Sequence, residues 1–355
     1  MKAIEISGRK GVHSHKLCPD IVSSVIRASE GLRSGFRDVI PFVLERPGDS
    51  VKRQMVFRFK SQMFFPGVDT GAVLKIVLGG LMENGYGLRA LRLFSAEHAV
   101  RRGIFESYKG YEYSIYSNGP DAVPDFDREK CLGRLGLEMS DTPVLGGGQF
   151  AEQYGISSEQ LGDMWQKAVK KEAVVKLAPK LLATALDPGT GPVAVLNAQM
   201  ANSRLRVERE GGVLLAAVVE SLGEDSSSWA RMRGRFLGSS EPGQARKGSL
   251  RQFLADQHDS YHLVDDQNNY NGVHLSSCVL ESVLEMALWF FMAPEELKTG
   301  RYLIERGILR PDLDWLMFNP VANFAGNRKS VFTHTDCLDA KQAVPVLIEI
   351  LEDRG

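Results

Sequence analysis

Alternation of apolar and polar residues predicts two strands near the start of this chain. Met55–Lys60 (MVFRFK) and Tyr86–Phe94 (YGLRALRLF) both alternate with a period of two, as half-buried β-strands do. Between them, the apolar residues of Val68–Glu83 recur at helical spacing. Ser95 directly follows the second strand and is a suitable N-cap for a short helix. The chain is therefore expected to begin its core as strand, helix, strand, helix.

The middle of the chain interrupts this pattern. Residues 109–190 open with a turn-rich stretch and read as two helices over Ser157–Leu186, so we interpret them as a mainly helical insertion. The run Gly146–Gly148 is not a P-loop, because no Gly-Lys-Ser/Thr follows it, and a flexible turn is the better interpretation. Strand character returns at Pro192–Leu196 and at Gly211–Glu220.

The last third of the chain contains a long polar loop and two clear helices. Asp225–Met232 reads as a polar, helix-compatible turn. Residues 238–272 are rich in Gly, Ser, Asp and Asn and read as a loop, and a loop of that length is usually functional. Ser277–Phe291 gives the strongest helix signal, and Ala340–Glu352 predicts a helix at the C-terminal end.

The predicted elements divide the chain into five parts. They are an N-terminal extension (1–52) with a helix from about Asp20 to Leu32, two halves of a core (53–108 and 191–297), the insertion (109–190), and a C-terminal extension (298–355). With 355 residues, 43% hydrophobic and 25% charged, the composition is that of a globular protein with room for additions to one core.

Charge and cysteine content narrow the class of protein. The 43 basic and 44 acidic residues nearly cancel, so nucleic acid is not an expected partner, although a local basic groove remains open. The four cysteines are far apart and show no CxxC spacing, which favours a reduced protein. The first residues lack a signal-peptide pattern, and no window approaches the roughly 20 apolar residues of a membrane span. We therefore expect a cytoplasmic protein without a membrane partner.

The candidate chemistry centres on a histidine before the strongest helix. His274 is followed by Ser276 and Ser277, either of which could cap the helix, whose free N–H groups favour a nearby anion. Glu285 lies far enough along that helix to fold its carboxylate back toward the imidazole. Such a carboxylate would hold one ring nitrogen as N–H and leave the other as a nucleophile. The alternatives are a capping or surface role for His274 and a solvated position for Glu285.

Basic residues upstream could bind phosphate. Arg235 and Arg251 flank the Gly/Ser-rich loop, and the planar guanidinium suits multidentate phosphate binding. Lys60 ends an apolar strand, where its charge could meet a terminal phosphate. A solvated basic face for the arginines and a snorkelling side chain for Lys60 are the alternatives. His13, His15 and Cys18 have metal-like spacing but lack a fourth ligand, so no metal site is predicted. His334 and Cys337 receive no role.

The segment from Asn271 to Leu297 resembles the active-site segment of nucleoside diphosphate kinases. In that family a histidine is followed by Gly-Ser-Asp-Ser-Val-Glu-Ser, then by a helix ending Leu-Trp-Phe, then by Pro-Glu-Glu-Leu. This chain has His274-Leu-Ser-Ser-Cys-Val, then Glu285, Leu288-Trp289-Phe290, and Pro294-Glu295-Glu296-Leu297. The resemblance implies that His274 accepts the γ-phosphoryl group, that Glu285 orients it, and that Ser276 contacts the histidine region.

Shorter fragments resemble the same family in the same order. FRFK (Phe57–Lys60) matches its first strand and the phosphate-contacting lysine, GRFLGSSEP (Gly234–Pro242) its first arginine segment, and KGSLRQF (Lys247–Phe253) its second. The resemblance implies phosphate contacts from Lys60, Arg235 and Arg251, a hydroxyl donor at Ser240, a sugar contact from Asn271, and a weaker match to an active-site tyrosine at Tyr108.

The resemblance also implies a fold and a reaction. The fold would be α+β, a ferredoxin-like α/β sandwich with an antiparallel sheet and helices on one face. The γ-phosphoryl group of a nucleoside triphosphate would pass through phosphohistidine to a nucleoside diphosphate or a related acceptor. Mg²⁺ would enter with the nucleotide and be held mainly by phosphate oxygens and water. A homo-oligomer is left open.

The sequence departs from the family at several positions. Ser61-Gln62 replaces Pro-Asp after the lysine, and Leu275 and Ser277 replace the Gly and Asp beside the serine. The insertion falls where the family keeps a nucleotide-binding helical hairpin, so phosphate chemistry should be better preserved than base recognition. Two other functions remain open, namely a catalytically inactive nucleotide-binding or assembly module and an enzyme with a specialised acceptor.

Overall fold

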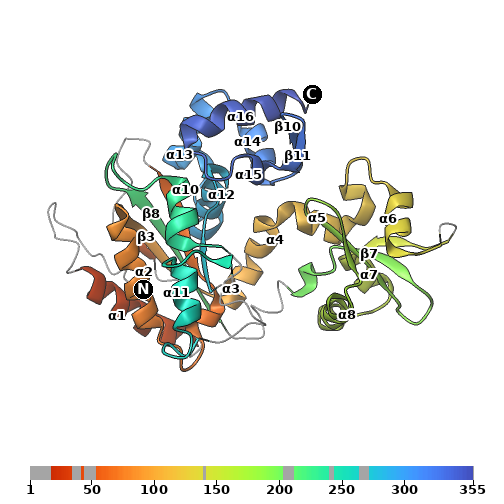
Figure 1. Cartoon of the computed structure of the whole chain (residues 1–355), viewed down its shortest axis with the longest axis horizontal. Coiled ribbons are helices and arrows are strands. Elements are labelled where there is room, and N and C mark those ends of the chain that lie inside the picture. Colours follow the sequence, from red (N-terminus) through yellow and green to blue (C-terminus); the bar gives the residue numbers. More distant parts are fainter. Residues whose placement is uncertain are drawn as a thin grey trace. The chain divides into compact units, whose positions relative to one another are not determined.

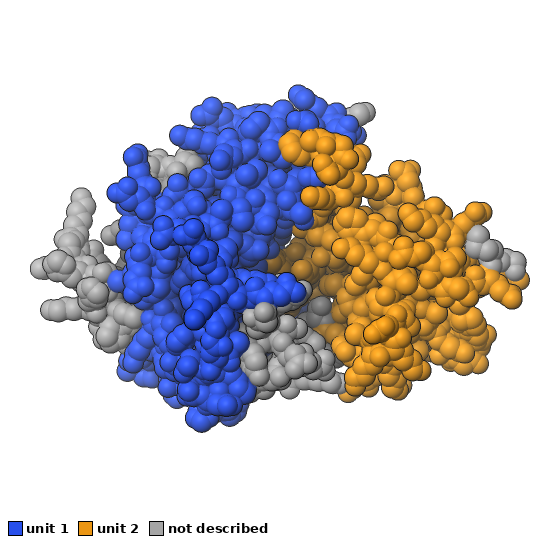
Figure 2. Space-filling model, viewed as in Figure 1, with its two compact units in different colours: residues 1–102, 210–317, 332–355 blue, residues 103–209, 318–331 orange. Residues whose placement is uncertain are grey.

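The computed structural model divides into two compact units. It describes residues 17–33, 41–43, 53–138, 141–202, 212–239, 244–263 and 272–354. The first unit comprises 1–102, 210–317 and 332–355, and the second comprises 103–209 with 318–331 (Figure 2). The second unit is therefore longer than the insertion expected over 109–190, and it also takes in a piece of the expected C-terminal extension.

The first unit is built on a five-stranded sheet. Its strand order is β1-β3-β8-β2-β9, and every neighbouring pair is antiparallel. Figure 1 labels two of these strands, β3 and β8. The strands are β1 (Pro41–Val43), β2 (Gln54–Phe59), β3 (Tyr86–Ser95), β8 (Val213–Ser221) and β9 (Val273–Leu275). The expectation of a mixed α/β protein with an antiparallel sheet is confirmed.

The strand register places His274 beside an arginine. In the β2–β9 pair His274 lies directly opposite Arg58, and in the β2–β8 pair Arg58 lies opposite Ala216. Directly opposed residues project from the same face of a sheet. The imidazole and the Arg58 guanidinium therefore share one face.

Both faces of this sheet are covered at its central strand, β8. All nine residues of β8 are buried, although successive side chains of a strand point to opposite faces. Helix α12 (Val279–Phe290) contacts β2, and α13 (Lys298–Glu305) and α14 (Arg310–Met317) pack on α12. The C-terminal helices therefore bury the helix that carries Glu285.

The remaining helical elements of the first unit include the helices predicted over Asp20–Leu32, Val68–Glu83 and Ala340–Glu352 and the short helix predicted after Ser95. They are α1 (Leu17–Arg33), η1 (Ser61–Phe64), α2 (Thr70–Glu83), α3 (Ala96–Arg101), α10 (Trp229–Arg231), the π-helix η3 (Met232–Leu237), α11 (Leu250–Asp256), η5 (Pro294–Glu296), α15 (Val331–His334) and α16 (Ala340–Glu352). Helix α11 lies inside the segment expected to be a loop. Ser249 caps it by accepting from the Gln252 amide at 3.4 Å, and Leu250 and Leu254 are buried.

The second unit contains a sheet where a second helix was expected. Only the first part of Ser157–Leu186 is helical (α8, Ser158–Lys170), and the rest forms the hairpin β5 (Val174–Ala178) and β6 (Leu181–Leu186). Pro179 lacks an amide hydrogen, and Lys180 adopts a positive φ of 60°. Both favour a turn over a continuing helix.

The other elements of the second unit surround this hairpin. The sheet order is β4-β7-β6-β5, with β4 (Val144–Gly146) parallel to β7 (Val193–Leu196), and the strands β10 (Val321–Phe324) and β11 (Asn327–Ser330) pair separately. The helices are α4 (Ile104–Tyr108), α5 (Gly110–Asn118), η2 (Gly119–Ala122), α6 (Arg128–Leu135) and α7 (Gly147–Gln153). No helix in the described ranges is long and apolar enough to cross a membrane.

The triple glycine has a packing role. Gly146–Gly148 joins β4 to α7. A Cβ at Gly146 or Gly147 would collide with Tyr116 of α5, and one at Gly148 would lie in tight contact, 3.0 Å from the Tyr116 ring. Side chains larger than hydrogen therefore do not fit at this contact. The interpretation as a flexible turn is wrong because the segment is close-packed.

Candidate functional site

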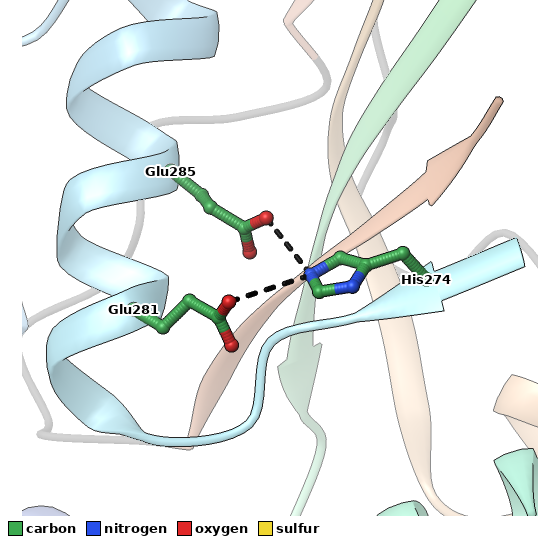
Figure 3. A group of neighbouring side chains, drawn as sticks. All are labelled: His274, Glu281 and Glu285. Atoms are coloured by element: carbon green, nitrogen blue, oxygen red, sulfur yellow. Dashed lines mark ion pairs between the residues drawn. The ribbon is translucent and has the colours of Figure 1, made fainter. Parts of the chain in front are cut away.

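His274 occupies the middle of β9 and faces two carboxylates. Its Nε2 lies 2.9 Å from Glu285 Oε1 and 4.0 Å from Glu281 Oε1 (Figure 3). The His274 side chain is 17% exposed to solvent, whereas the Glu285 side chain is fully buried. Figure 3 shows the second ring nitrogen, Nδ1, on the side of the imidazole away from both carboxylates. The structure thus brings together the histidine and glutamate that the sequence paired.

Helix α12 carries the carboxylates of both Glu281 and Glu285 on the side that faces His274, because of where the helix begins and because of its period. The N-cap is Cys278, whose Sγ accepts from the Glu281 amide at 3.5 Å, so the prediction of Ser276 or Ser277 as cap is wrong. Glu281 and Glu285 are four residues apart and therefore lie on the same side of the helix, one turn above the other.

Ser276 fixes the orientation of Glu285. Its Oγ donates to Glu285 Oε2 at 2.6 Å and accepts from the Val56 amide at 2.9 Å. Ser276 is completely buried, and its contact is with the glutamate that holds the histidine. The hydroxyl leaves the other carboxylate oxygen, Oε1, directed at the imidazole.

If His274 accepts a phosphoryl group, as the resemblance implies, Ser276→Ala should slow that step about fivefold, because one positioning hydrogen bond is worth on the order of 1 kcal/mol. Ser282→Ala is the matched control. Its hydroxyl is equally buried but donates to the Gln54 carbonyl at 2.8 Å, away from Glu285. Single-turnover labelling compares the two variants, and equal rates would contradict a positioning role for Ser276.

Arg58 is a site residue that the sequence did not single out. Its Nη2 lies 2.8 Å from Glu285 Oε1, and its guanidinium stacks 5.1 Å from the centre of the Trp289 ring. Arg58 interrupts a strand whose other residues are all buried. A charge in such a strand requires a partner, and that signal could have identified it.

Two further arginines donate hydrogen bonds to the main chain on either side of His274. Arg233 Nη1 donates to the Leu275 carbonyl at 3.0 Å, and Arg251 Nη2 donates to the Val273 carbonyl at 3.1 Å. Arg251 Nη1 also donates to the Gly238 carbonyl at 2.8 Å, and the residue is 5% exposed. Arg251 was expected to contact phosphate, but its donors are directed at main-chain oxygens.

Replacement of Arg251 tests this structural role. Arg251→Met should lower the free energy of unfolding by on the order of 3 kcal/mol, because two charge-assisted hydrogen bonds are lost. The exposed Arg235→Met should change it by no more than about 0.5 kcal/mol. Denaturant unfolding followed by tryptophan fluorescence measures both variants. A negligible loss for Arg251→Met would indicate that its main-chain contacts do not support the fold.

Burial and the three arginines set the charge state of the site. Burial lowers the pKa of His274 well below its usual value, and Arg58 lowers it further, while Glu281 acts in the opposite direction. Burial raises the pKa of Glu285, and Arg58 opposes that rise. Burial and the neighbouring Arg233 lower the pKa of Arg251 to about 10, so it stays cationic at neutral pH. The imidazole is consequently neutral at pH 7.

The other predicted residues lie in different places. The Lys60 amide donates to the Gly272 carbonyl at 2.9 Å, two residues from His274, and its side chain is partly buried. Arg235 is exposed on η3 and lines a groove of about 600 Å³ with α2 and α11, a groove that does not include His274. Tyr108 ends α4 in the second unit. Ser240 and Asn271 lie outside the described residues.

The chain matches no known protein family, no curated protein and no solved structure. The resemblance to nucleoside diphosphate kinases therefore depends on the motif residues alone.

Proposed function

We propose that this protein is a nucleoside diphosphate kinase-like phosphotransferase that forms a phosphohistidine at Nδ1 of His274. The observation that carries the proposal is the 2.9 Å contact between His274 Nε2 and the buried Glu285. A carboxylate there favours the tautomer with the proton on Nε2, which leaves the lone pair on Nδ1. A neutral imidazole with a lone pair on its second nitrogen can act as a nucleophile.

The reaction would proceed in two displacements. Nδ1 attacks the γ-phosphorus of a nucleoside triphosphate, the bond to the β,γ-bridging oxygen breaks, and the nucleoside diphosphate leaves with Mg²⁺ on its phosphates. The positive charge gained by the ring is shared with Nε2–H and stabilised by Glu285. A β-phosphate oxygen of a second diphosphate then attacks the phosphorus, and the N–P bond breaks to restore the neutral ring.

The charges around the ring support this chemistry. Arg58, Arg233 and Arg251 all act on His274, and their combined field favours an incoming anion. We keep Lys60 as a candidate phosphate contact, because its main chain pairs with Gly272 beside β9. Contacts of Arg235, Ser240, Asn271 and Tyr108 with the nucleotide stay predictions.

The strand order supports a ferredoxin-like fold for the first unit. In chain order the core strands are β2, β3, β8 and β9, and in the sheet they lie as β3-β8-β2-β9 with antiparallel neighbours. Helix α2 connects the first two, and α10, η3 and α11 lie between the last two. We infer a ferredoxin-like βαββαβ core to which β1 adds a fifth strand.

One observation favours a catalytically inactive nucleotide-binding module as the second candidate. Arg251, expected at the phosphates, is buried and donates to two main-chain carbonyls. Such a module would bind nucleotide without becoming phosphorylated.

Labelling of the pure chain with γ-labelled ATP and Mg²⁺ tests the proposal. We expect acid-labile, base-stable label, in the peptide that contains His274, which nucleoside diphosphates then remove. Retention of the label with diphosphates and its loss to another acceptor would indicate the specialised enzyme. Nucleotide binding without label would establish the inactive module.

A further inference from the structure

Three potential metal ligands converge at the candidate site, one of them on the candidate nucleophile itself. They are His274 Nε2, Glu281 Oε1 and Glu285 Oε1, and these atoms all lie within 4.8 Å of one another (Figure 3). One comes from β9 and two come from successive turns of α12. A nitrogen and two carboxylate oxygens in this arrangement could occupy one side of a metal ion and leave its other positions open.

Neighbouring groups hold each carboxylate by its other oxygen. Glu285 Oε2 accepts from Ser276 Oγ at 2.6 Å, and Glu281 Oε2 accepts from the Ser277 amide. The remaining oxygen of each carboxylate is thereby turned toward the imidazole. Orientation of this kind, by donors outside the ligand set, is typical of protein metal sites.

Burial of the two carboxylates favours a cation that they could bind directly. The Glu281 and Glu285 side chains are 9% and 0% exposed. Arg58 contacts Glu285, and Arg233 and Arg251 also act on His274, so a bound cation would share the carboxylates with these guanidinium groups. Arg58 shares Glu285 Oε1 with the imidazole, and we therefore expect weaker affinity than that of a closed structural zinc site.

We propose that His274, Glu281 and Glu285 bind a divalent transition-metal ion of the Zn²⁺ type. The nitrogen ligand and the low ligand number suit Zn²⁺ and Co²⁺, whereas Mg²⁺ prefers six oxygens in an octahedron. The Mg²⁺ that accompanies a nucleotide should therefore not compete for this site.

Metal binding here would exclude phosphorylation, a consequence that rests on the proposed function. A metal ion on Nε2 uses the lone pair at that nitrogen, so the ring proton must move to Nδ1. Protonated Nδ1 has no lone pair with which to attack phosphorus. Zn²⁺ would thus act as an inhibitor by fixing the wrong tautomer.

Titration of the nucleotide-free chain with Co²⁺ tests the site, because the visible absorption of Co²⁺ reports low coordination by nitrogen and oxygen ligands. We expect one ion per chain, displaced by Zn²⁺ and not by Mg²⁺. Glu281→Gln retains an oxygen for the Ser277 amide but loses the charge. We expect this variant to bind Co²⁺ more than about tenfold more weakly, because loss of a group that only orients a ligand already costs roughly tenfold in metal affinity. His274→Ala should abolish binding.

Two control variants exclude binding elsewhere. Glu97→Gln removes an exposed carboxylate from α3 and should leave the titration unchanged. The double variant His13→Ala, His15→Ala removes the two histidines near Cys18 and should also leave the titration unchanged. Circular dichroism confirms that each variant is folded.

No Co²⁺ absorption in the parent chain, or equal affinity in the parent and Glu281→Gln, would overturn the metal site. Because this titration contains no nucleotide, its outcome is independent of phosphotransfer. If the protein does form phosphohistidine, Zn²⁺ should suppress labelling in the parent and suppress it less in Glu281→Gln. Equal suppression of both would contradict the site.

Discussion

His274→Gln is expected to abolish labelling by γ-labelled ATP, with a loss of at least about 10⁴-fold in the rate of phosphoenzyme formation. The nitrogen lone pair of the glutamine amide is delocalised into its carbonyl group and is therefore not nucleophilic toward phosphorus. Its amide can nevertheless still donate to Glu285 Oε1, which His274 Nε2 approaches to 2.9 Å in the parent chain. The variant should therefore keep most of its folding stability while losing phosphoenzyme formation. Acid-labile label on the isolated chain is the measurement.

His258→Gln is the matched control for this experiment. His258 follows α11, and its side chain is 29% exposed and lies 3.0 Å from Asp259. It should label at the parent rate. Undiminished label on His274→Gln would refute the assignment of the nucleophile, and label that appears on another histidine would relocate it.

Removal of the Glu285 carboxylate is expected to have the second largest effect. Glu285→Ala leaves the Arg58 guanidinium without the carboxylate oxygen at 2.8 Å. Breaking a buried ion pair by removing one partner costs about 3–5 kcal/mol of folding free energy. The imidazole also loses the group that fixes its tautomer, so we expect phosphoenzyme formation to fall by about 10²–10⁴-fold. Denaturant unfolding and rapid-quench labelling measure the two effects.

A double variant separates stability from chemistry. Arg58→Met with Glu285→Met removes both charges, and a buried pair replaced by apolar side chains of similar size is often neutral in stability or better. We expect its unfolding free energy to recover most of the loss seen in Glu285→Ala, while labelling stays low. Recovery of labelling together with stability would mean that Glu285 acts only through the fold.

Local patterns were sufficient where neighbours along the chain decide the conformation. The alternation of Met55–Lys60, the helical spacing of Val68–Glu83 and the cap at Ser95 depend on contacts within a few residues, and the structure confirms all three. The second of the two helices expected over Ser157–Leu186 is wrong, because this segment forms the β5–β6 hairpin and β6 pairs in turn with β7. These cross-strand contacts compete with helix formation.

The candidate-site residues likewise divide into those predictable from nearby sequence and those placed by contacts between distant segments. His274 and Glu285 were predictable as a pair because a helix of known period connects them. Arg58 belongs to a strand more than 200 residues earlier in the chain, and only the β2–β9 register brings it to His274. Arg251 was assigned to phosphate because sequence shows that a guanidinium is present but not which acceptors surround it.

The sequence by itself determined the main elements of the sheet, the strongest helix and the candidate nucleophile with its glutamate. Tertiary structure decided which charges meet there. It placed Arg58 on Glu285, turned Arg251 toward main-chain carbonyls, and brought Glu281 within 4.0 Å of His274 Nε2. The physical reason is that periodicity and capping depend on neighbouring residues, whereas the partners of a buried charge are set by strand register and packing between segments far apart in the chain.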